Sequence, residues 1–230
     1  MSDTTDARRG LWRVAGALAI AHVVTMLAGL SLQKVATVGA SPSSYVTAYE
    51  GGSLVKSMTG ECLTCVSFLL FLLAATLLAR LVRGQAEVSR WWASLAAACG
   101  AIYVAITLAV ALPGVGAAVY DGHHGAPLAV VTALSDLHYF ATFASMAVLG
   151  AFTLALVAAA QVSRALPRWV AYPGYVVGVL CLAAVPGAGT SLFDYATLLW
   201  FVWFIGTGIA SLRQARTGRV RQPAGSAALS

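Results

Sequence analysis

Residues 62–82 decide the fold of this 230-residue chain, and they read CLTCVSFLLFLLAATLLARLV. Arg80 is the only charged residue among them. An α-helix rises about 1.5 Å per residue, so a stretch of this length crosses the roughly 30 Å of hydrocarbon in a bilayer. The sequence therefore predicts a membrane-spanning helix over these residues.

Five other stretches have a similar length and composition, at residues 11–32, 91–112, 137–160, 169–185 and 192–212. The segments between them are rich in Gly, Pro, Ser or charge and are expected to end helices, as at 39–42, 83–85, 113–116, 164–167 and 186–189. The chain is 60% hydrophobic and 10% charged, whereas a soluble domain is about a quarter charged. We therefore expect an all-α membrane bundle with six transmembrane helices in one domain over 1–212, followed by a disordered basic cytoplasmic tail over 213–230.

The arginines fall on one side of this predicted bundle. They lie before span one, between spans two and three, between spans four and five, and after span six: Arg8, Arg9, Arg13, Arg80, Arg83, Arg90, Arg164, Arg168, Arg213, Arg216, Arg219 and Arg221. Lys34 and Lys56 are the basic residues on the other side. Basic residues are retained in the cytoplasm, so we expect both termini there and a multi-pass protein of the cell membrane. The basic residues flank apolar segments and form no stripe with surface aromatics, which disfavours a nucleic-acid partner.

The connections carry three further expectations. The longest, 33–61, should lie outside the cell, with 45–57 as a short amphipathic helix on the membrane surface. Residues 126–136 either extend the fourth span outward or form a short interfacial turn. Residues 8–40 have a small-residue site near their end, as a cleaved signal would, but their apolar run is longer than a usual signal core, which favours a span.

A short motif precedes the fifth span. Residues 165–170 read ALPRWV, and Gly174 and Gly178 follow. This pattern resembles the LPxW…G…G start of span five in a large actinobacterial family of six-helix integral membrane proteins, a domain of unknown function. The six-span layout and the start of span four at Asp136 are also similar to that family. The resemblance implies a fold and brings no reaction with it.

Three carboxylates lie at the outer ends of predicted spans: Glu61 on span two, Asp136 on span four and Asp194 on span six. A polar group in lipid costs several kcal/mol unless it finds a partner, so such positions carry information. The three helix ends could surround one outward-opening cavity. In the alternative interpretation these residues are helix caps, since acidic side chains are favoured near helix N-termini.

The histidines allow a metal or haem site. Asp121, His123 and His124 share a glycine-flanked segment, and Asp136 with His138 would complete a shell for zinc, copper or iron. Adjacent histidines point in different directions, and the sequence has no HxxxH or HExxH spacing, so the leading expectation is that no cofactor is bound. His22, in the middle of span one, is expected to be neutral and hydrogen-bonded to a neighbouring helix; the alternative is an axial haem ligand paired with His138.

Cysteines and aromatic residues suggest two other kinds of site. Cys62 and Cys65 form a CxxC pair suited to disulfide exchange, or else they are packing residues or a passive disulfide. Cys99 and Cys181 lie inside other spans and do not make the second pair that a thiol oxidase needs. Near mid-bilayer, aromatic side chains can stabilise a cation, hold a flat hydrophobe or simply pack against small residues; the residues concerned are Trp200, Trp203 and Tyr103.

The sequence has no GxSxG motif and no glycine-rich phosphate loop. We hypothesise a small membrane enzyme whose outward cavity takes a lipid-phase hydrophobe for isoprenoid-type cyclisation or isomerisation. Its acid or base would come from Glu61, Asp136 and Asp194, assisted by Tyr139 and Tyr195. Its substrate would contact Trp200, Trp203, Tyr103 and His138. One alternative is a non-catalytic protein that binds a ligand, a lipid or a partner subunit, including its own copy in an oligomer; the other is a metal- or haem-binding redox protein.

Overall fold

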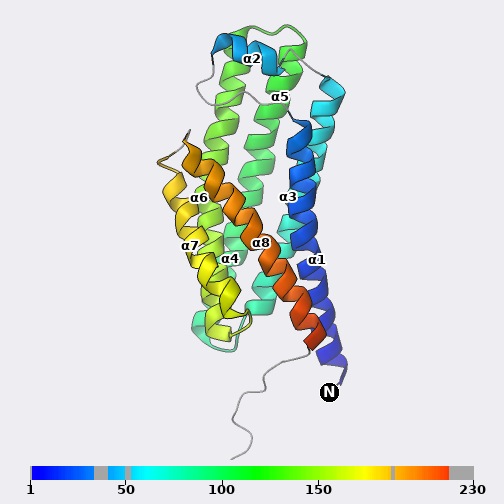
Figure 1. Ribbon diagram of the computed structural model, residues 1–230, viewed down its shortest axis with the longest axis vertical. Helices are drawn as coiled ribbons and strands as arrows, with labels where there is room; N and C mark the ends of the chain where they lie inside the picture. Colours follow the sequence, from blue (N-terminus) through cyan, green and yellow to red (C-terminus); the bar gives the residue numbers. More distant parts are fainter. Residues whose placement is uncertain (1, 34–40, 50–52, 188–189, 218–230) are drawn as a thin grey trace, which may run out of the picture.

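The computed structural model describes residues 2–33, 41–49, 53–187 and 190–217 (Figure 1). These residues form α-helices and one π-helical turn, with no strand among them, which confirms the all-α fold class. The elements are α1 (Ser2–Leu32), α2 (Pro42–Tyr49), α3 (Leu54–Val82), α4 (Glu87–Ile106), η1 (Thr107–Ala111), α5 (Leu112–His123), α6 (Leu128–Ser163), α7 (Arg168–Ala184) and α8 (Ser191–Thr217).

Five continuous helices are long and apolar enough to cross a membrane, counted over the described residues. They are α1, α3, the unbroken run from α4 through η1 to α5, α6, and α8. α7 is apolar too, but its 17 residues measure about 25 Å at 1.5 Å per residue. Each of the six predicted spans coincides with one of these helices. The helical, multi-pass membrane architecture is therefore confirmed, and α7 is its short member.

The helices pack in a closed ring. α1 contacts α3, α3 contacts α4, α4 contacts α6, α6 contacts α7, α7 contacts α8, and α8 returns to α1 (Figure 1). Large apolar side chains cover the outside of this ring; Val176 is 60% exposed and Val202 is 68% exposed. Such a surface suits lipid rather than water, because soluble proteins rarely expose contiguous apolar patches of this kind.

Glycines allow three pairs of ring helices to approach closely. A Cβ added at Gly16 of α1 would lie 2.6 Å from the carbonyl oxygen of Gly208 on α8. On α6, a Cβ at Gly150 would lie 2.8 Å from the carbonyl oxygen of Gly178 on α7. α1 and α3 meet similarly at Gly29. Small residues let membrane helices gain van der Waals contact, and the fifth-span motif residue Gly178 serves this packing.

The expected helix end at residues 113–116 was wrong. The helix continues from α4 to α5 through η1, where the N–H of Leu112 donates to the carbonyl of Thr107 in a π-type bond. Pro113 then falls in the first turn of α5. A proline is tolerated there because the π-type bond shifts the hydrogen-bond register just before it, so the carbonyl that its missing N–H would have met can be satisfied otherwise. The π-turn therefore lets the chain pass a proline without ending the helix.

Helix α2 crosses the ends of α5 and α6 that lie away from the arginines (Figure 1). Tyr45 and Tyr49 are buried against a cluster that includes Val119 and Val131, and the Tyr49 hydroxyl lies 2.9 Å from Ser135 Oγ. The surface helix expected at 45–57 was wrong in its bounds and surroundings, since burying both tyrosines favours protein over lipid surface. α6 begins at Leu128, so residues 128–136 extend the fourth span outward, the first of the two alternatives.

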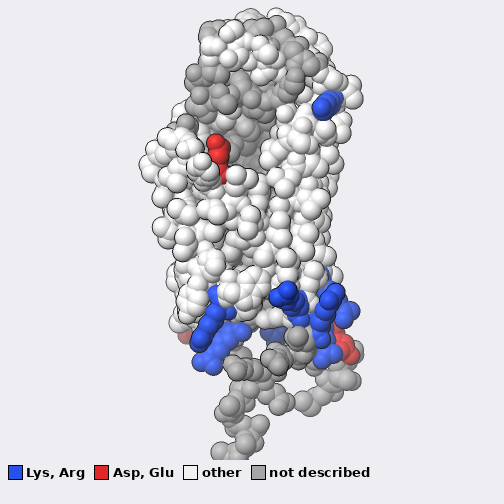
Figure 2. Space-filling model, viewed as in Figure 1, with Lys and Arg blue, Asp and Glu red and all other residues white. Residues whose placement is uncertain are grey.

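The arginines of the described residues lie at one end of the bundle. Figure 2 shows Lys and Arg side chains gathered where α1 begins and α8 ends, with one basic side chain near the opposite end. Lys56, in the first turn of α3, is at that opposite end. The charge asymmetry read from the sequence is therefore a property of the folded chain.

The basic tail starts later than expected. α8 continues to Thr217, so the prediction of disorder from residue 213 was wrong for its first residues, while 218–230 lie outside the described part. Arg216 stands in the last turn of α8, where a positive charge stabilises the helix dipole. The Gln214 side-chain amide also donates to the carbonyl oxygen of Ala165, which holds the end of α8 against the α6–α7 turn.

Candidate functional site

The candidate site lies at one level of the bundle. About twenty residues of helix, or roughly 30 Å, separate the arginine-bearing end from Glu61 on α3, Ala111 at the end of η1 and Asp194 on α8. That distance is the thickness of bilayer hydrocarbon. These three residues therefore lie near the boundary of the hydrocarbon that is remote from the arginines. His138 approaches this level from α6 by bonding to Ala111.

Glu61 is the buried carboxylate of the three that the sequence indicated. It is 7% exposed and shares the inward face of α3 with Thr64 and Phe68, three and seven residues further on. Neither of its carboxylate oxygens has a hydrogen-bond partner among the described residues. A buried carboxylate without a partner is costly when ionised, so this environment favours the neutral acid that carries its proton.

The capping interpretation fails for two of the three carboxylates. α3 begins at Leu54 with Ser53 as its N-cap, and α6 begins at Leu128, so Glu61 and Asp136 both lie two or more turns inside their helices. Asp194 does lie in the first turn of α8, where the helix dipole favours an acid. Asp136 and Asp194 are both exposed, so Glu61 alone of the three is buried.

His138 has a fixed orientation. Its Nδ1 lies 2.7 Å from the carbonyl oxygen of Ala111, the last residue of the π-helical turn. Because a carbonyl only accepts, Nδ1 carries the proton, and in the neutral ring Nε2 holds the lone pair. π-helical turns occur often at functional sites. The bond to Ala111 therefore leaves His138 with an oriented proton acceptor at the level of Glu61.

A series of contacts between aromatic rings connects His138 to the start of α8. The rings of His138 and Tyr139 are 5.2 Å apart, Tyr139 stacks on Phe143 at 6.1 Å, and Phe143 meets Phe193 edge to face at 5.1 Å. Tyr139 also lies within electrostatic range of Asp194. The structure thus brings Tyr139, His138 and Asp194 along one wall. Tyr195 is 62% exposed on α8.

A hollow in the surface lies beside the start of α8, where this wall ends (Figure 2). α8 begins well below α2, and its helix neighbours are α1 and α7 (Figure 1). Figure 2 shows a hollow in the face beside the start of α8, with acidic surface at its edge. Asp194 is the acidic residue of that first turn. The described residues therefore leave this side of the bundle hollowed at the level of the candidate site (Figure 2).

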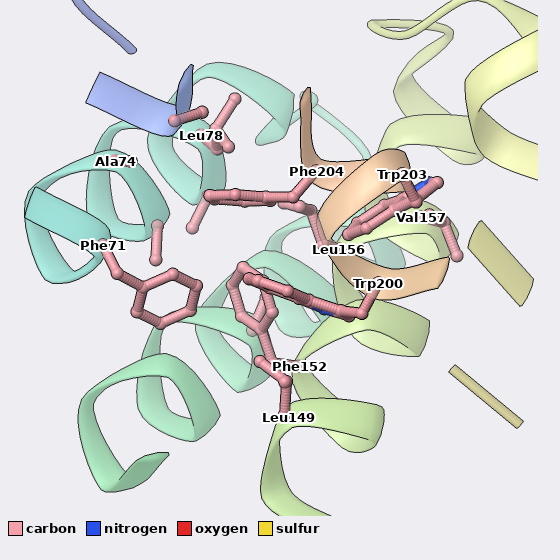
Figure 3. Close-up of a cluster of buried hydrophobic side chains, with 14 of the residues drawn as sticks. Phe71, Ala74, Leu78, Leu149, Phe152, Leu156, Val157, Trp200, Trp203 and Phe204 are labelled. Atoms are coloured by element: carbon pink, nitrogen blue, oxygen red, sulfur yellow. The ribbon is translucent and has the colours of Figure 1, made fainter. Parts of the chain in front are cut away.

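The mid-membrane aromatics form a packed core (Figure 3). Trp200 is 1% exposed and its Nε1 donates to Thr153 Oγ1 at 3.0 Å. Trp203 Nε1 donates to the carbonyl oxygen of Val170 at 3.0 Å, and Tyr103 lies edge to face with Phe71 at 5.1 Å. Both indole N–H groups are therefore satisfied inside the protein. This geometry fits the alternative that these aromatic residues serve helix packing. Their contact with a substrate stays a prediction.

His22 is bonded to the neighbouring helix, as expected. Its Nδ1 lies 2.8 Å from both the carbonyl oxygen and the Oγ of Ser67 on α3. Its Nε2 has no hydrogen-bond partner among the described residues, and the ring stands edge to face with Trp200 at 5.9 Å and Phe204 at 5.7 Å. Because a carbonyl oxygen only accepts, Nδ1 carries the proton and donates to Ser67, and Ser67 Oγ donates to the carbonyl oxygen of His22 at 3.2 Å. Sequence reasoning did not identify Ser67, because its partner lies on another helix.

The remaining candidates are dispersed. Cys62 is exposed and Cys65 half-buried, and both are free thiols, as are buried Cys99 and Cys181. Within the described ranges, no three His, Cys, Asp or Glu side chains come together as a possible metal site. His124 Nδ1 bonds to the carbonyl of its own helix at Tyr120. The metal and haem alternatives, including Asp121 and His123, and the redox role of the CxxC pair stay predictions.

No known family model matches this chain, and no curated protein or solved structure is detectably similar to it. A function for the protein must therefore be argued from the chemistry of its own site.

Proposed function

We propose that this protein is an enzyme of the cell membrane that crosses the bilayer six times, with both termini in the cytoplasm. Two observations support the topology. α7 completes the ring between α6 and α8, and the arginines of the described residues lie at one end of that ring. Arginine-rich ends of membrane helices stay in the cytoplasm. In this orientation Glu61, His138 and Asp194 lie toward the outer leaflet.

The proposed chemistry is proton transfer to a hydrophobic substrate that enters from the lipid. The buried, unpartnered carboxyl of Glu61 carries this proposal. A buried carboxyl that keeps its proton is in the protonation state that general acid catalysis requires. The surface hollow beside the start of α8 gives such a substrate a route from the bilayer.

The finer proposal is isomerisation or cyclisation of an isoprenoid-type substrate. Glu61 gives its proton to a carbon–carbon double bond, a C–H bond forms, and a carbocation results. Loss of a proton from a neighbouring carbon to an acceptor such as His138 Nε2 restores a double bond and neutralises the product. The proton then returns to Glu61, so no oxidant, reductant or second substrate is consumed. His138 is suited to this role because its Nδ1–H is already engaged by Ala111.

The test compares the organic-solvent extracts of membranes from native-host cells that carry the intact gene, E61Q or D136N. Gln has the shape of Glu but no acidic proton, and exposed Asp136 controls for loss of a carboxylate at the same end of the bundle. We expect a hydrophobic compound that accumulates in the E61Q extract and is consumed with the intact gene and with D136N. Identical extracts from all three strains, at equal protein levels, would mean that Glu61 is not catalytic and would leave non-catalytic binding as the function.

A further inference from the structure

Three adjoining cavities lie at the arginine-bearing end, around the turn between α6 and α7. The first, of about 590 Å³, is lined by Gln161, Arg164, Arg168 and Tyr172 among others. A second, of about 270 Å³, lies on the other side of the same turn and includes Arg164 again, with Arg213. A third, of about 470 Å³, is an apolar groove along α4, α6 and α7 that shares Gln161 with the first. A basic hollow thus continues into an apolar groove.

Two arginines of the first cavity, Arg164 and Arg168, have no carboxylate partner within the described part of the chain. Among the described residues, the ion pair within 4 Å joins Arg9 to Asp6 on α1, so neither Arg164 nor Arg168 is paired with a described carboxylate. Both arginines are exposed. Two guanidinium groups on one cavity wall make a site for an anion, and arginine presents a planar fork that matches a phosphate.

The backbone at Arg164 is unusual. Arg164 has φ 54° and ψ 29°, the left-handed conformation, and is the non-glycine residue with positive φ in the described chain. The N–H of Ala165 donates to the carbonyl of Ala160 at 3.0 Å, a helix ending at which glycine is the usual residue. Any side chain here is held at an energetic cost. The backbone conformation at this position would favour glycine over arginine. The presence of arginine therefore points to a role for its side chain.

Gln161 stands where the two cavities meet. The Tyr175 hydroxyl donates to Gln161 Oε1 at 2.7 Å, so the amide oxygen is engaged and the amide NH₂ remains a donor. Beyond it, Trp92, Leu154, Ala158 and Val162 line the groove. Trp169 and Tyr172 are 52% and 56% exposed beside the turn, as interfacial aromatics are. A ligand of this site would be anionic at the interface and apolar toward the membrane interior.

We propose that this is a binding site for an anionic glycerophospholipid of the surrounding leaflet. Its phosphodiester is held by Arg164 and Arg168, its glycerol oxygens accept from Gln161, and one acyl chain lies in the apolar groove. The site is distinct from the one at Glu61 and is remote from it along the bundle. It does not depend on the proposed reaction.

The test titrates purified protein in detergent with dioleoyl-phosphatidylglycerol and counts bound lipids by native mass spectrometry. The variants are R164G, the double variant R164Q/R168Q, and R83G as a control. R83G removes the same charge at the same end of the bundle, but Arg83 has φ −64° and lines none of the three cavities. Matched arms use dioleoyl-phosphatidylcholine and glycerol phosphate in place of phosphatidylglycerol.

We expect phosphatidylglycerol to bind about fivefold more weakly to R164G and about 25-fold more weakly to R164Q/R168Q, with R83G like the wild type. R164G should keep or raise the melting temperature, because glycine adopts the left-handed conformation without strain. Weaker lipid binding by R164G could then not be attributed to unfolding. Equal weakening in R83G, or equal binding of phosphatidylcholine, would overturn the proposal. Glycerol phosphate binding as tightly as the lipid would overturn it too and identify a soluble phosphate ligand.

Discussion

At the scale of single residues, the membrane interior of this protein contains two polar groups that behave differently. His22 is fully buried, but Ser67 meets its Nδ1 at 2.8 Å and aromatic rings surround the rest. Glu61 is nearly as buried, and neither carboxylate oxygen finds a partner among the described residues. A paired polar group in a packed core stabilises the fold, whereas an unpaired acid is retained at a cost that structure alone does not explain.

We predict that S67A lowers the melting temperature of the purified protein. The variant removes the hydroxyl that donates to the carbonyl oxygen of His22 at 3.2 Å and lies beside its Nδ1, and a buried hydrogen bond contributes about 0.5–1.5 kcal/mol. S94A is the matched control, because Ser94 is exposed on α4. The two variants are compared by thermal unfolding in the same detergent. Equal melting temperatures for S67A and S94A would show that the contact between Ser67 and His22 contributes nothing.

At this scale the sequence identified candidate residues, but it did not predict which of them are buried or what they contact. It named Glu61, Asp136 and Asp194 together, because all three lie at the ends of apolar stretches. In the structure Glu61 is buried and the other two are exposed. Burial depends on how each helix is rotated about its axis in the bundle. A single sequence specifies that rotation poorly when every face of a helix is apolar. For the same reason it anticipated a bonded His22 but not Ser67 as the partner.

At the scale of helices, α7 decides the topology of the chain. Its 17 residues are fewer than the five longer helices have, yet it lies between α6 and α8 in the ring. A helix of about 25 Å crosses a bilayer if flanking residues reach the interfaces or the bilayer thins locally. Trp169 at its start is suited to one interface.

Reporter fusions test whether α7 crosses. Alkaline phosphatase fused after Thr190, beyond the end of α7, should be active, because the enzyme works only outside the cytoplasm. The same reporter fused after Arg164 or at the end of the chain should be inactive, and green fluorescent protein at those points should fluoresce. Cytoplasmic signals on both sides of α7 would mean that it does not span, and would reverse the placement of α8.

The boundaries of the helices were less predictable than their positions. Apolar length located the five long helices and the shorter α7, but α3 begins at Leu54 and α6 at Leu128, well before the apolar stretches do. Those first turns are stabilised by packing outside the hydrocarbon, as where Tyr49 meets Ser135. Pro113 misled the prediction because a π-helical turn absorbs it. Local sequence signals mark helix ends only where tertiary contacts do not override them.

At the scale of the whole molecule, the bundle has two chemically different ends. The arginine-bearing end carries the arginine-lined hollow, and the opposite end carries Glu61, His138 and the surface hollow beside the start of α8 (Figures 1 and 2). The aromatic core around Trp200 and Phe204 separates the two (Figure 3). This division was predictable from the arginine positions. The surface hollow beside α8 was not, because it depends on where α8 starts relative to α2.

The central claim is that Glu61 is a proton-bearing acid reached from the lipid, and a hydrophobic carbodiimide tests it. Such reagents partition into membranes and modify carboxyl groups that carry a proton. Protein reconstituted in vesicles at neutral pH is treated with dicyclohexylcarbodiimide, and the modified residues are identified by peptide mass spectrometry, with E61Q and a water-soluble carbodiimide as controls. We predict an adduct at Glu61 with the hydrophobic reagent, none at Asp136 or Asp194, and none in E61Q. An unmodified Glu61 beside modified Asp136 or Asp194 would contradict the account.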